Sequence, residues 1–298
     1  MHHVNVIAIE HIERADDPRV ARFRNVKDAA SRSAGLFLAE SELVVARVFD
    51  AGVSVSALLV TPNRLERLTS RIAEAQGLGT EGSNRRTFPI FVGEQPLVEA
   101  IVGFAMHRGC LAICERAPLP TPKILLADAR TIVVLDDVVD PDNVGSVFRH
   151  VAGFGADGIL LSAHAGDPLY RKSVRSSMSW VLEVNYARLP TRDSLLPTLH
   201  DGGFVTIALT PRRNAPSLRS VIQALQPTER VALVLGAEVQ GLPDKTIAEA
   251  TYQARIPMTT HVDSLNVATA GALALYDLTT AHPNRIVERT PLTDWLDD

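Results

Sequence analysis

The sequence predicts an α/β protein built from two domains, and three observations lead to that prediction. The chain has 298 residues, of which 46% are hydrophobic, and this length exceeds the ~250 residues at which a single core stops growing. Residues 117–122 (APLPTP) contain three prolines, which favour an extended linker. After this linker, short apolar runs alternate with helical segments. We therefore expect domains at 1–116 and 124–298, joined by a linker at 117–123.

The first domain is expected to be a small α/β fold. Residues 36–39 (LFLA) have the composition of a strand and precede a helix over 40–51. Residues 57–60 (ALLV) predict a buried strand, after which Thr61 as N-cap and Pro62 at the first helical position begin a helix that continues over 64–75. The Gly- and Ser-rich residues 77–87 predict a surface loop.

The second domain is expected to hold an open, doubly wound parallel sheet. Strands are predicted at residues 131–135 (TIVVL), 158–161 (GILL), 204–209 (FVTIAL) and 231–235 (VALVL). Such continuous apolar runs are typical of parallel strands that are covered on both faces. Helices are predicted between them, over 144–153, 167–177, 194–200 and 244–250, with a last helix from about Ser264 to Leu278. Ligands of these sheets bind beyond the carboxyl ends of the strands.

Composition and charge exclude several classes of protein. The net charge of −4 argues against a protein that is basic over its whole surface, although it allows a local basic patch. No apolar run approaches the ~20 residues of a membrane span, and the amino terminus lacks a signal-peptide pattern. Cys110 and Cys114 share a face of a predicted strand, which indicates buried thiols, and no second Cys/His pair supports a zinc site. We expect a metal-free protein of the reducing cytoplasm.

Two loops after predicted strands combine polar side chains with glycine. In the loop after residue 135, Asp142 or Asn143 could cap the next helix, which would carry Arg149 about two turns later. The alternative to a functional role is an acidic turn followed by a capped helix, which accounts for each of these residues when it is taken alone. The loop 235–242 (LGAEVQGL) places Glu238 between two glycines, which allow close approach of a backbone to a ligand. A tight turn with a surface glutamate is the alternative.

The third loop, residues 256–272, joins a polar cluster to a run of small residues. Ser264 or Asp263 is the expected N-cap of the last helix, and Asn266 is expected in its first turn. Residues 268–272 (ATAGA) permit very close packing of another segment, a ligand or another subunit. An alanine-rich core helix explains the small residues but leaves the polar cluster unexplained.

The three loops together resemble a known family. The segments DDVVDPDNVGSVFR (136–149), LVLGAEVQGL (233–242) and IPMTTHVDSLNVATAGALALYDL (256–278) resemble, in order and spacing, the three motifs of SpoU-type (TrmH-like) RNA 2′-O-ribose methyltransferases of the SPOUT superfamily. The resemblance covers roughly residues 130–280 and includes the segment 174–178 (VRSSM). Residues 23–115 are more weakly similar to the substrate-binding domain of this family, a small ribosomal-protein-like α/β fold.

The resemblance implies a fold, a cofactor and partners. It implies a trefoil-knotted methyltransferase domain at 124–298, a substrate-binding domain for RNA at 1–116, and a homodimer formed through the carboxyl-terminal domain with the active site near the interface. The cofactor would be S-adenosyl-L-methionine. Ribosomal RNA is favoured over tRNA as the substrate, because minimal members of the family act on tRNA without an amino-terminal domain.

The same resemblance implies roles for individual residues. Asn143, Arg149, Glu238, Ser264 and Asn266 match the active-site positions of the three motifs, and Gly236, Ile256 and Leu265 match positions whose backbone groups hold the cofactor. Leu209 and Thr210, at the end of a predicted strand, are expected to line the same cleft. Because an arginine stays protonated at ordinary pH, we expect Arg149 to grip the target phosphate and stabilise the developing alkoxide. The proton acceptor stays open between an RNA phosphate and an arginine whose pKa falls only in the complex.

Basic residues outside the motifs suggest where RNA binds. The resemblance implies that the RNA backbone contacts four basic residues, Arg171, Lys172, Arg175 and Arg212. Considered apart from the resemblance, the same four residues are interpreted as ordinary solvated charges. Two serines depart from the family pattern, since Ser41 and Ser179 stand where glycine is usual.

Two other functions would share this fold class. A nucleotide-dependent dehydrogenase would have G-x-G-x-x-G after its first strand, which is absent here. A catalytically inactive RNA-binding module of the same fold is the stronger alternative, and the intact motif residues argue against it.

Overall fold

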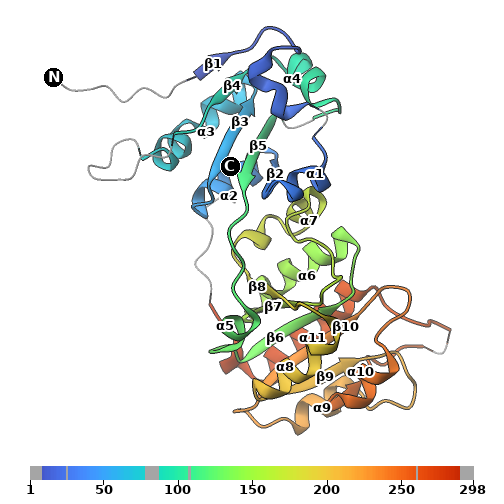
Figure 1. The fold of residues 1–298 in the computed structure, drawn as a ribbon. Coiled ribbons are helices and arrows are strands. Elements are labelled where there is room, and N and C mark those ends of the chain that lie inside the picture. Colours follow the sequence, from blue (N-terminus) through green and yellow to red (C-terminus); the bar gives the residue numbers. More distant parts are fainter. Residues whose placement is uncertain (1–8, 25, 78–86, 107–108, 260, 289–298) are drawn as a thin grey trace. The chain divides into compact units, whose positions relative to one another are not determined.

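A computed structural model describes residues 9–24, 26–77, 87–106, 109–259 and 261–288. They form two compact units (Figure 1). The first unit takes in the described residues as far as Ala117 together with the short segment Leu169–Arg175, and the second takes in Pro118–Pro168 and the described residues from Ser176 onward. Most of the loop predicted over 77–87 lies outside the described residues.

The first unit is built around a mixed five-stranded sheet in the order β1-β4-β3-β5-β2. β4 is parallel to β1 and β3, whereas β5 is antiparallel to β2 and β3. Cys110 and Cys114 lie buried in β5, as predicted. The strands are β1 (Ile9–His11), β2 (Leu36–Glu40), β3 (Val55–Val60), β4 (Ile90–Val92) and β5 (Cys110–Glu115), and the helices are η1 (Pro18–Phe23), α1 (Asp28–Ser33), α2 (Glu42–Asp50), α3 (Pro62–Ala75) and α4 (Gln95–Val102).

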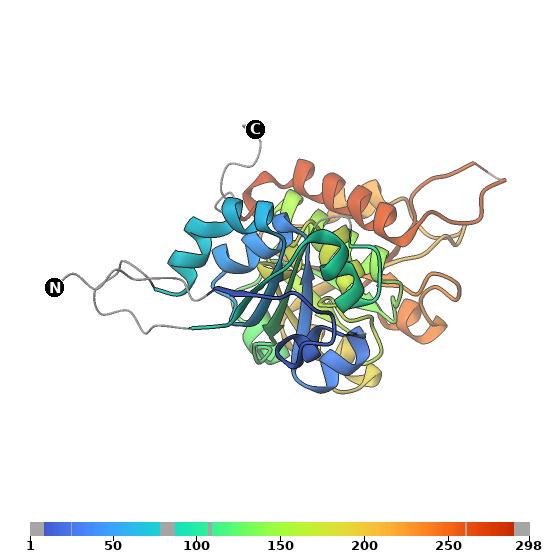
Figure 2. The same cartoon turned by 90° about the horizontal axis from the view of Figure 1, so that it is seen from above.

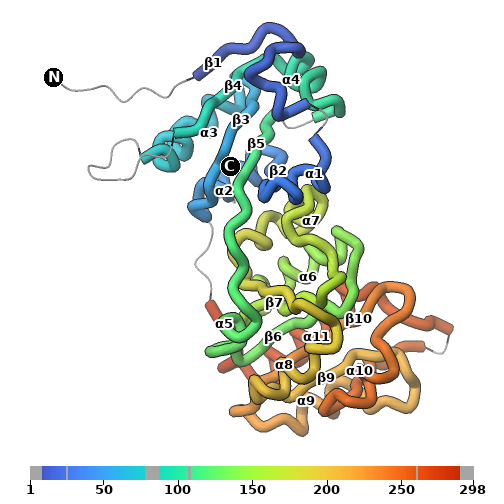
Figure 3. Tube along the Cα trace, in the orientation of Figure 1, coloured from blue at the N-terminus to red at the C-terminus, as the bar shows by residue number. Residues whose placement is uncertain are grey.

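The second unit is a six-stranded parallel sheet in the order β11-β9-β10-β6-β7-β8, which confirms the predicted parallel α/β architecture. Its path can be followed by colour in Figure 3. The strands are β6 (Thr131–Asp136), β7 (Gly158–Leu161), β8 (Asn185–Arg188), β9 (Phe204–Leu209), β10 (Arg230–Gly236) and β11 (Tyr252–Ala254). The sequence predicted the four central apolar strands, β6, β7, β9 and β10, but neither edge strand, β8 or β11.

Helices cover both faces of this sheet, which explains the continuous apolar runs of its central strands. On one face, side chains of α5, α8 and α10 join a core cluster with the strands. On the other face, α11 packs against α6, α9 and β10, and Figure 2 shows α11 (red) along its length. The helices of this unit are α5 (Pro122–Leu126), α6 (Pro141–Phe154), η2 (Trp180–Leu182), η3 (Arg192–Ser194), α8 (Leu195–Asp201), α9 (Leu218–Ala224), α10 (Asp244–Glu249), α11 (Val267–Ala281) and η4 (Pro283–Arg285). All but the last residue of α7 (Arg171–Ser176) belong to the segment Leu169–Arg175, which groups with the first unit.

The small residues of α11 let it lie directly on the sheet. A Cβ added at Gly271 would come within 2.9 Å of Leu235 Cδ1 in β10. A side chain at this position would therefore displace Leu235, and glycine lets the helix and the strand pack closely without that shift. In the described part of the chain, no helix combines the length and hydropathy that a membrane span requires.

Two predicted helix caps were wrong by two or three positions. Asp140, rather than Asp142 or Asn143, caps α6, because its side chain accepts from Asp142 N at 2.8 Å and from Asn143 N at 3.2 Å, with Pro141 at the first helical position. Asn266, rather than Ser264 or Asp263, caps α11 by accepting from Thr269 N at 3.1 Å. Since Asp140 does the capping, the Asn143 side chain is available for other partners.

Ser41 and Ser179 both have positive φ angles, which gives a physical reason for the glycine usual at these positions. Ser41 has φ 95° and Ser179 has φ 68°. Ser41 also caps α2, with its Oγ 3.4 Å from Val44 N. Ser179 is fully buried, and its hydroxyl has no partner among the described residues. Ser179 therefore combines backbone strain with an unsatisfied polar group.

We predict that Ser179→Gly stabilises the protein. The left-handed backbone costs a non-glycine residue about 1–2 kcal/mol, and loss of the buried hydroxyl removes a further cost, while the unfolded chain gains about 0.5–1 kcal/mol of entropy. The expected net gain is about 1 kcal/mol, measurable as a higher midpoint in denaturant titration.

Ser179→Ala is the matched control, because it removes the hydroxyl but keeps the strained backbone. We expect it to be less stable than Ser179→Gly. Equal midpoints for the two variants would show that the backbone angle contributes nothing.

Candidate active site

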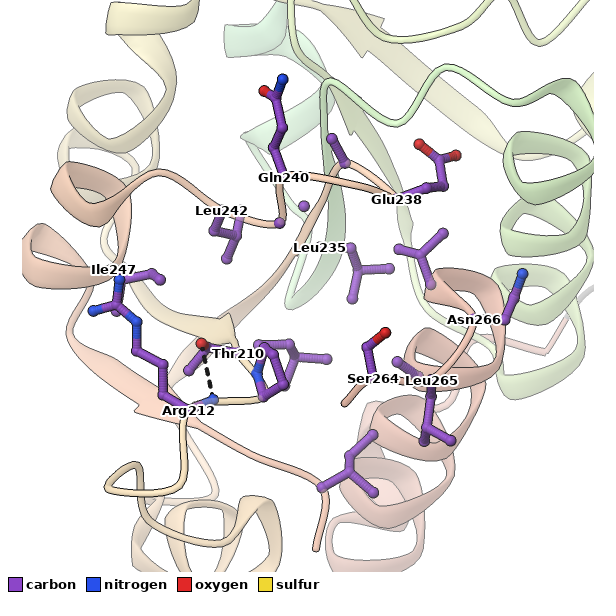
Figure 4. A pocket seen from close by; sticks show the side chains of 18 of the residues that line it. Thr210, Arg212, Leu235, Glu238, Gln240, Leu242, Ile247, Ser264, Leu265 and Asn266 are labelled. Atoms are coloured by element: carbon purple, nitrogen blue, oxygen red, sulfur yellow. Dashed lines mark hydrogen bonds between the residues drawn. The ribbon is translucent and has the colours of Figure 1, made fainter. Parts of the chain in front are cut away.

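A pocket of about 600 Å³ opens at the carboxyl ends of β9, β10 and β11 (Figure 4). This is the edge at which parallel sheets bind ligands, and the volume is in the range of sites for small molecules and cofactors. The wall is formed by residues 209–212 after β9, residues 235–242 with Asp244 and Ile247 after β10, Ala254 in β11, Ile256, Met258 and residues 264–267 after β11, and Asn143 and Ala270 from the helices.

The pocket brings together most of the residues that the sequence singled out. Four of the five predicted active-site residues and all five predicted cofactor residues line it, namely Asn143, Glu238, Ser264, Asn266, Gly236, Ile256, Leu265, Leu209 and Thr210. Arg212, which was expected to contact RNA, also lines this pocket. Arg149 does not.

A chain of hydrogen bonds joins the three loops at one end of the pocket. Asn143 Nδ2 donates to Glu238 Oε1 at 3.1 Å, and Asn266 Nδ2 donates to Asn143 Oδ1 at 2.8 Å. The same Glu238 oxygen accepts from Asp140 N at 3.2 Å. Because both ends of the Asn143 amide are engaged, its orientation is fixed. Glu238 and Asn266 are thereby held by a side chain that lies far from both in the sequence.

Gly236 is required where the loop after β10 turns back on itself. A Cβ added there would lie 2.4 Å from Leu242 N and 2.5 Å from the carbonyl carbon of Gly241. The turn is closed by Gly241 N, which donates to Ala237 O at 2.9 Å, and Gly241 itself has φ 67°. The spacing of the two glycines is thus explained by the backbone of the loop.

Arg149 lies on another side of α6. It follows Asn143 by six residues, which in an α-helix is about 9 Å along the axis and roughly 120° around it. Its side chain is exposed and makes no hydrogen bond or ion pair with other described residues. The pocket of one chain therefore lacks this guanidinium.

Comparison with known proteins matches this arrangement to one family. Residues 130–276 match the SpoU rRNA Methylase family. A tRNA/rRNA methyltransferase of Mycobacterium bovis is 36% identical over 282 residues, which is 93% of this chain and 94% of the relative, and the same figures hold for a tRNA/rRNA methyltransferase of Mycobacterium tuberculosis strain H37Rv.

The chain belongs to the SpoU family of RNA methyltransferases.

Solved structures show the same fold at lower identity. The AdoMet-bound rRNA methyltransferase of Sinorhizobium meliloti superposes with a TM-score of 0.72 at 23% identity, over 91% of this chain and 98% of that one. The SpoU methyltransferase AviRb of Streptomyces viridochromogenes, in complex with AdoMet, gives a TM-score of 0.70 at 22% identity, over 89% and 98% of the two chains.

An ion-pair network fixes the start of the first SpoU motif. Asp136, at the end of β6, is buried and accepts from Arg192 Nε at 3.0 Å and from Arg192 Nη2 at 3.1 Å. Asp137 has φ 57°, accepts from Ser162 Oγ at 2.6 Å, and pairs with Arg192 Nη1 at 3.2 Å. Burial raises the pKa of Asp136, whereas its pairing with Arg192 lowers it. The network ties the ends of β6 and β7 to η3.

Sequence reasoning missed this network. The Asp136-Asp137 doublet after an apolar strand was a usable signal, since an acid at the end of a buried strand needs a partner. The identity of that partner depends on a contact with Arg192, 56 residues away, and the sequence contains no local sign of it.

The cations proposed for RNA binding have different surroundings. Within the first unit, Arg171 Nε pairs with Asp28 Oδ2 at 3.1 Å and its guanidinium lies 4.9 Å from the centre of the Phe104 ring. Lys172 and Arg175 in α7 are exposed. Arg171 is thus engaged with partners in its own unit, whereas the side chains of Lys172 and Arg175 are open to solvent.

We predict that Arg192→Ala destabilises the protein more at high pH than at low pH. The native pKa of Asp136 is already above its ordinary value, and without the guanidinium it rises further. A group with a raised native pKa favours the folded state when protonated, and this contribution is lost as pH rises through that pKa. The loss in the free energy of unfolding should reach about 2–3 kcal/mol at pH 8. This is less than the ~3–5 kcal/mol lost when a fully buried ion pair is broken, because Arg192 is partly solvated.

Thermal unfolding at pH 5 and pH 8 measures this difference. Arg192→Lys keeps the charge and should lose less stability, with a weaker dependence on pH. A loss in Arg192→Ala that is equal at the two pH values would contradict the assigned role of Asp136.

Proposed function

We propose that this SpoU-family chain transfers the methyl group of S-adenosyl-L-methionine to the 2′-hydroxyl of a ribose in RNA, with ribosomal RNA favoured over tRNA. The observation that carries the proposal is the meeting of all three motif loops at one pocket, joined through Asn143. The separate amino-terminal unit supports ribosomal RNA.

The residues around the pocket fit the cofactor. Its volume of about 600 Å³ accommodates a nucleoside with an amino-acid side chain. The backbone around Gly236, Ile256 and Leu265 would hold the cofactor, and Leu209 and Thr210 complete the wall. When bound, S-adenosylmethionine supplies an electrophilic methyl group on a sulfonium.

The polar residues divide into those that organise the site and those that act on RNA. Asn143 is committed to Glu238 and Asn266, so we assign it, with Glu238, to holding the loops and orienting the ribose. Ser264, which lines the pocket beside Asn266, is assigned to the ribose as a hydrogen-bonding group. Arg149, which stays protonated, is assigned to the target phosphate and the developing alkoxide.

The position of Arg149 supports a homodimer in which each pocket receives Arg149 from the partner. The outer surface of α11 supports the same proposal. Leu273 and Tyr276 on this helix are 41% and 54% exposed, and Ile286 and Val287 beyond it are also exposed. Large exposed apolar side chains grouped on one element are typical of an interface.

We also propose that the second unit carries a trefoil knot. The proposal rests on the resemblance of the three motif segments to the SpoU family, and the meeting of these segments at one pocket supports it.

RNA is proposed to contact the first unit, including Lys172 and Arg175 of its segment Leu169–Arg175. Both side chains are exposed cations on α7. With a net charge of −4 for the whole chain, attraction of RNA must come from a few placed cations rather than from bulk charge. Binding should therefore weaken as salt increases.

We predict that Arg149→Ala abolishes methyl transfer to RNA and leaves cofactor binding nearly unchanged. The guanidinium is expected to act on the phosphate and the alkoxide, and it lies outside the cofactor pocket. Loss of one such electrostatic donor costs about 10²–10³ in rate. Incorporation of labelled methyl groups and calorimetric titration with S-adenosylmethionine measure the two effects, and unchanged turnover would refute the role.

Mixing two inactive variants tests whether Arg149 acts across the dimer. Arg149→Ala retains Asn143, and Asn143→Ala retains Arg149, so a heterodimer would contain one complete site. After subunit exchange we expect about a quarter of wild-type activity, because half of the dimers are mixed and half of their sites are complete. No recovery in heterodimers whose formation has been verified would contradict a contribution from the partner.

The substrate is identified by mapping 2′-O-methyl groups in rRNA and tRNA from cells with and without the gene. We expect one or more sites in rRNA to lose methylation when the gene is deleted. A loss confined to tRNA would contradict the preference for ribosomal RNA while leaving the reaction in place.

A further inference from the structure

A pair of opposite charges lies on the pocket wall away from the Asn143 hydrogen-bond chain. Arg212 belongs to the segment after β9, and Asp244 is the first residue of α10. Both line the pocket, and Arg212 Nη2 forms an ion pair with Asp244 Oδ1. The segment that carries Arg212 is held by an internal hydrogen bond, in which Arg212 N donates to the side-chain oxygen Thr210 Oγ1 at 3.3 Å.

Figure 4 shows Arg212 on the opposite side of the pocket from Glu238 and Asn266. Arg212 lies beside Thr210 and Ile247, whereas Glu238 and Asn266 lie across the cavity with Leu235 between the two groups. The pocket therefore has two polar ends separated by apolar side chains. The end at Asn143 and Glu238 is the one assigned to the ribose, which leaves the charged end for the cofactor alone.

The Arg212–Asp244 pair contributes little to stability and can open at low cost. The two side chains are 42% and 92% exposed, and exposed ion pairs are worth about 0–1 kcal/mol. A ligand that offers both a carboxylate and an ammonium group can replace the contact between the two side chains by one contact to each of them.

We propose that Arg212 and Asp244 recognise the amino-acid end of S-adenosylmethionine, an inference that rests on the cofactor of the proposed function. The guanidinium of Arg212 binds the α-carboxylate, for which its planar fork is suited. Asp244 binds the α-ammonium group. The adenine ring is neutral and cannot form an ion pair with Arg212 or Asp244, so it lies against the apolar part of the wall. Arg212 is thus a cofactor residue rather than a contact of the RNA backbone.

Calorimetric titrations with three ligands distinguish the contribution of Arg212 from that of Asp244. S-Adenosylmethionine has both charged groups, its decarboxylated form lacks the carboxylate, and methylthioadenosine lacks the whole amino-acid end. We expect Arg212→Ala to weaken S-adenosylmethionine binding about tenfold to a hundredfold, as for loss of a charged hydrogen bond. Binding of the decarboxylated form and of methylthioadenosine should not change in this variant.

Asp244→Asn should give the complementary pattern. It should weaken binding of both S-adenosylmethionine and the decarboxylated form, and leave methylthioadenosine unchanged. Arg212→Lys keeps the charge but loses the planar fork. Its affinity for S-adenosylmethionine should therefore lie between those of the wild type and Arg212→Ala.

Two neighbours on α10 provide matched controls. Lys245→Ala and Glu249→Gln each remove one charge from exposed positions outside the pocket wall, and both should bind all three ligands as the wild type does. Equal losses for all three ligands in Arg212→Ala would overturn the proposal, because they indicate general damage to the pocket.

Unchanged cofactor affinity in Arg212→Ala would also overturn it, and if the KM for RNA rises at the same time, Arg212 is an RNA contact. In both cases the wild type still binds S-adenosylmethionine, so the proposed function stands. A wild type that does not bind this cofactor would overturn both.

Discussion

The amide of Asn143 is the interaction on which the site depends. It donates to Glu238 and accepts from Asn266, so one side chain on α6 sets the positions of the loop after β10 and of the start of α11. An amide can satisfy a carboxylate and another amide together only in one orientation, which makes the three loops interdependent. Asn143 and Asn266 are more than a hundred positions apart in the sequence. The fold brings them together at one end of the pocket.

The rest of the second unit serves to hold this arrangement. The parallel sheet places the loops after its strands at one edge, and the Asp136–Arg192 pair fixes the point at which the first of them leaves β6. Gly236 allows the second loop to fold back against Leu242 N. Arg212, which pairs with Asp244, lies on the side of the pocket opposite Glu238 and Asn266, with the apolar side chain of Leu235 between them.

Features that depend on local pattern could be predicted from the sequence, and features that depend on distant partners could not. Continuous apolar runs predicted the four central strands, whereas β8 and β11 are short edge strands with mixed patterns. Adjacent residues able to cap a helix compete, so Asp140 could not be told from Asp142 by residue type alone. The motif residues were found through their resemblance to a family, but the exclusion of Arg149 from the pocket follows from helix geometry.

The position of the transferred methyl group tests the central claim most directly. RNA methylated by the wild-type protein with methyl-labelled S-adenosylmethionine is digested completely with alkali, which cleaves RNA through the free 2′-hydroxyl. If that hydroxyl carries the label, cleavage at the modified nucleotide is blocked. The account predicts label in alkali-resistant dinucleotides. Label recovered only in mononucleotides would place the methyl group on a base and contradict it.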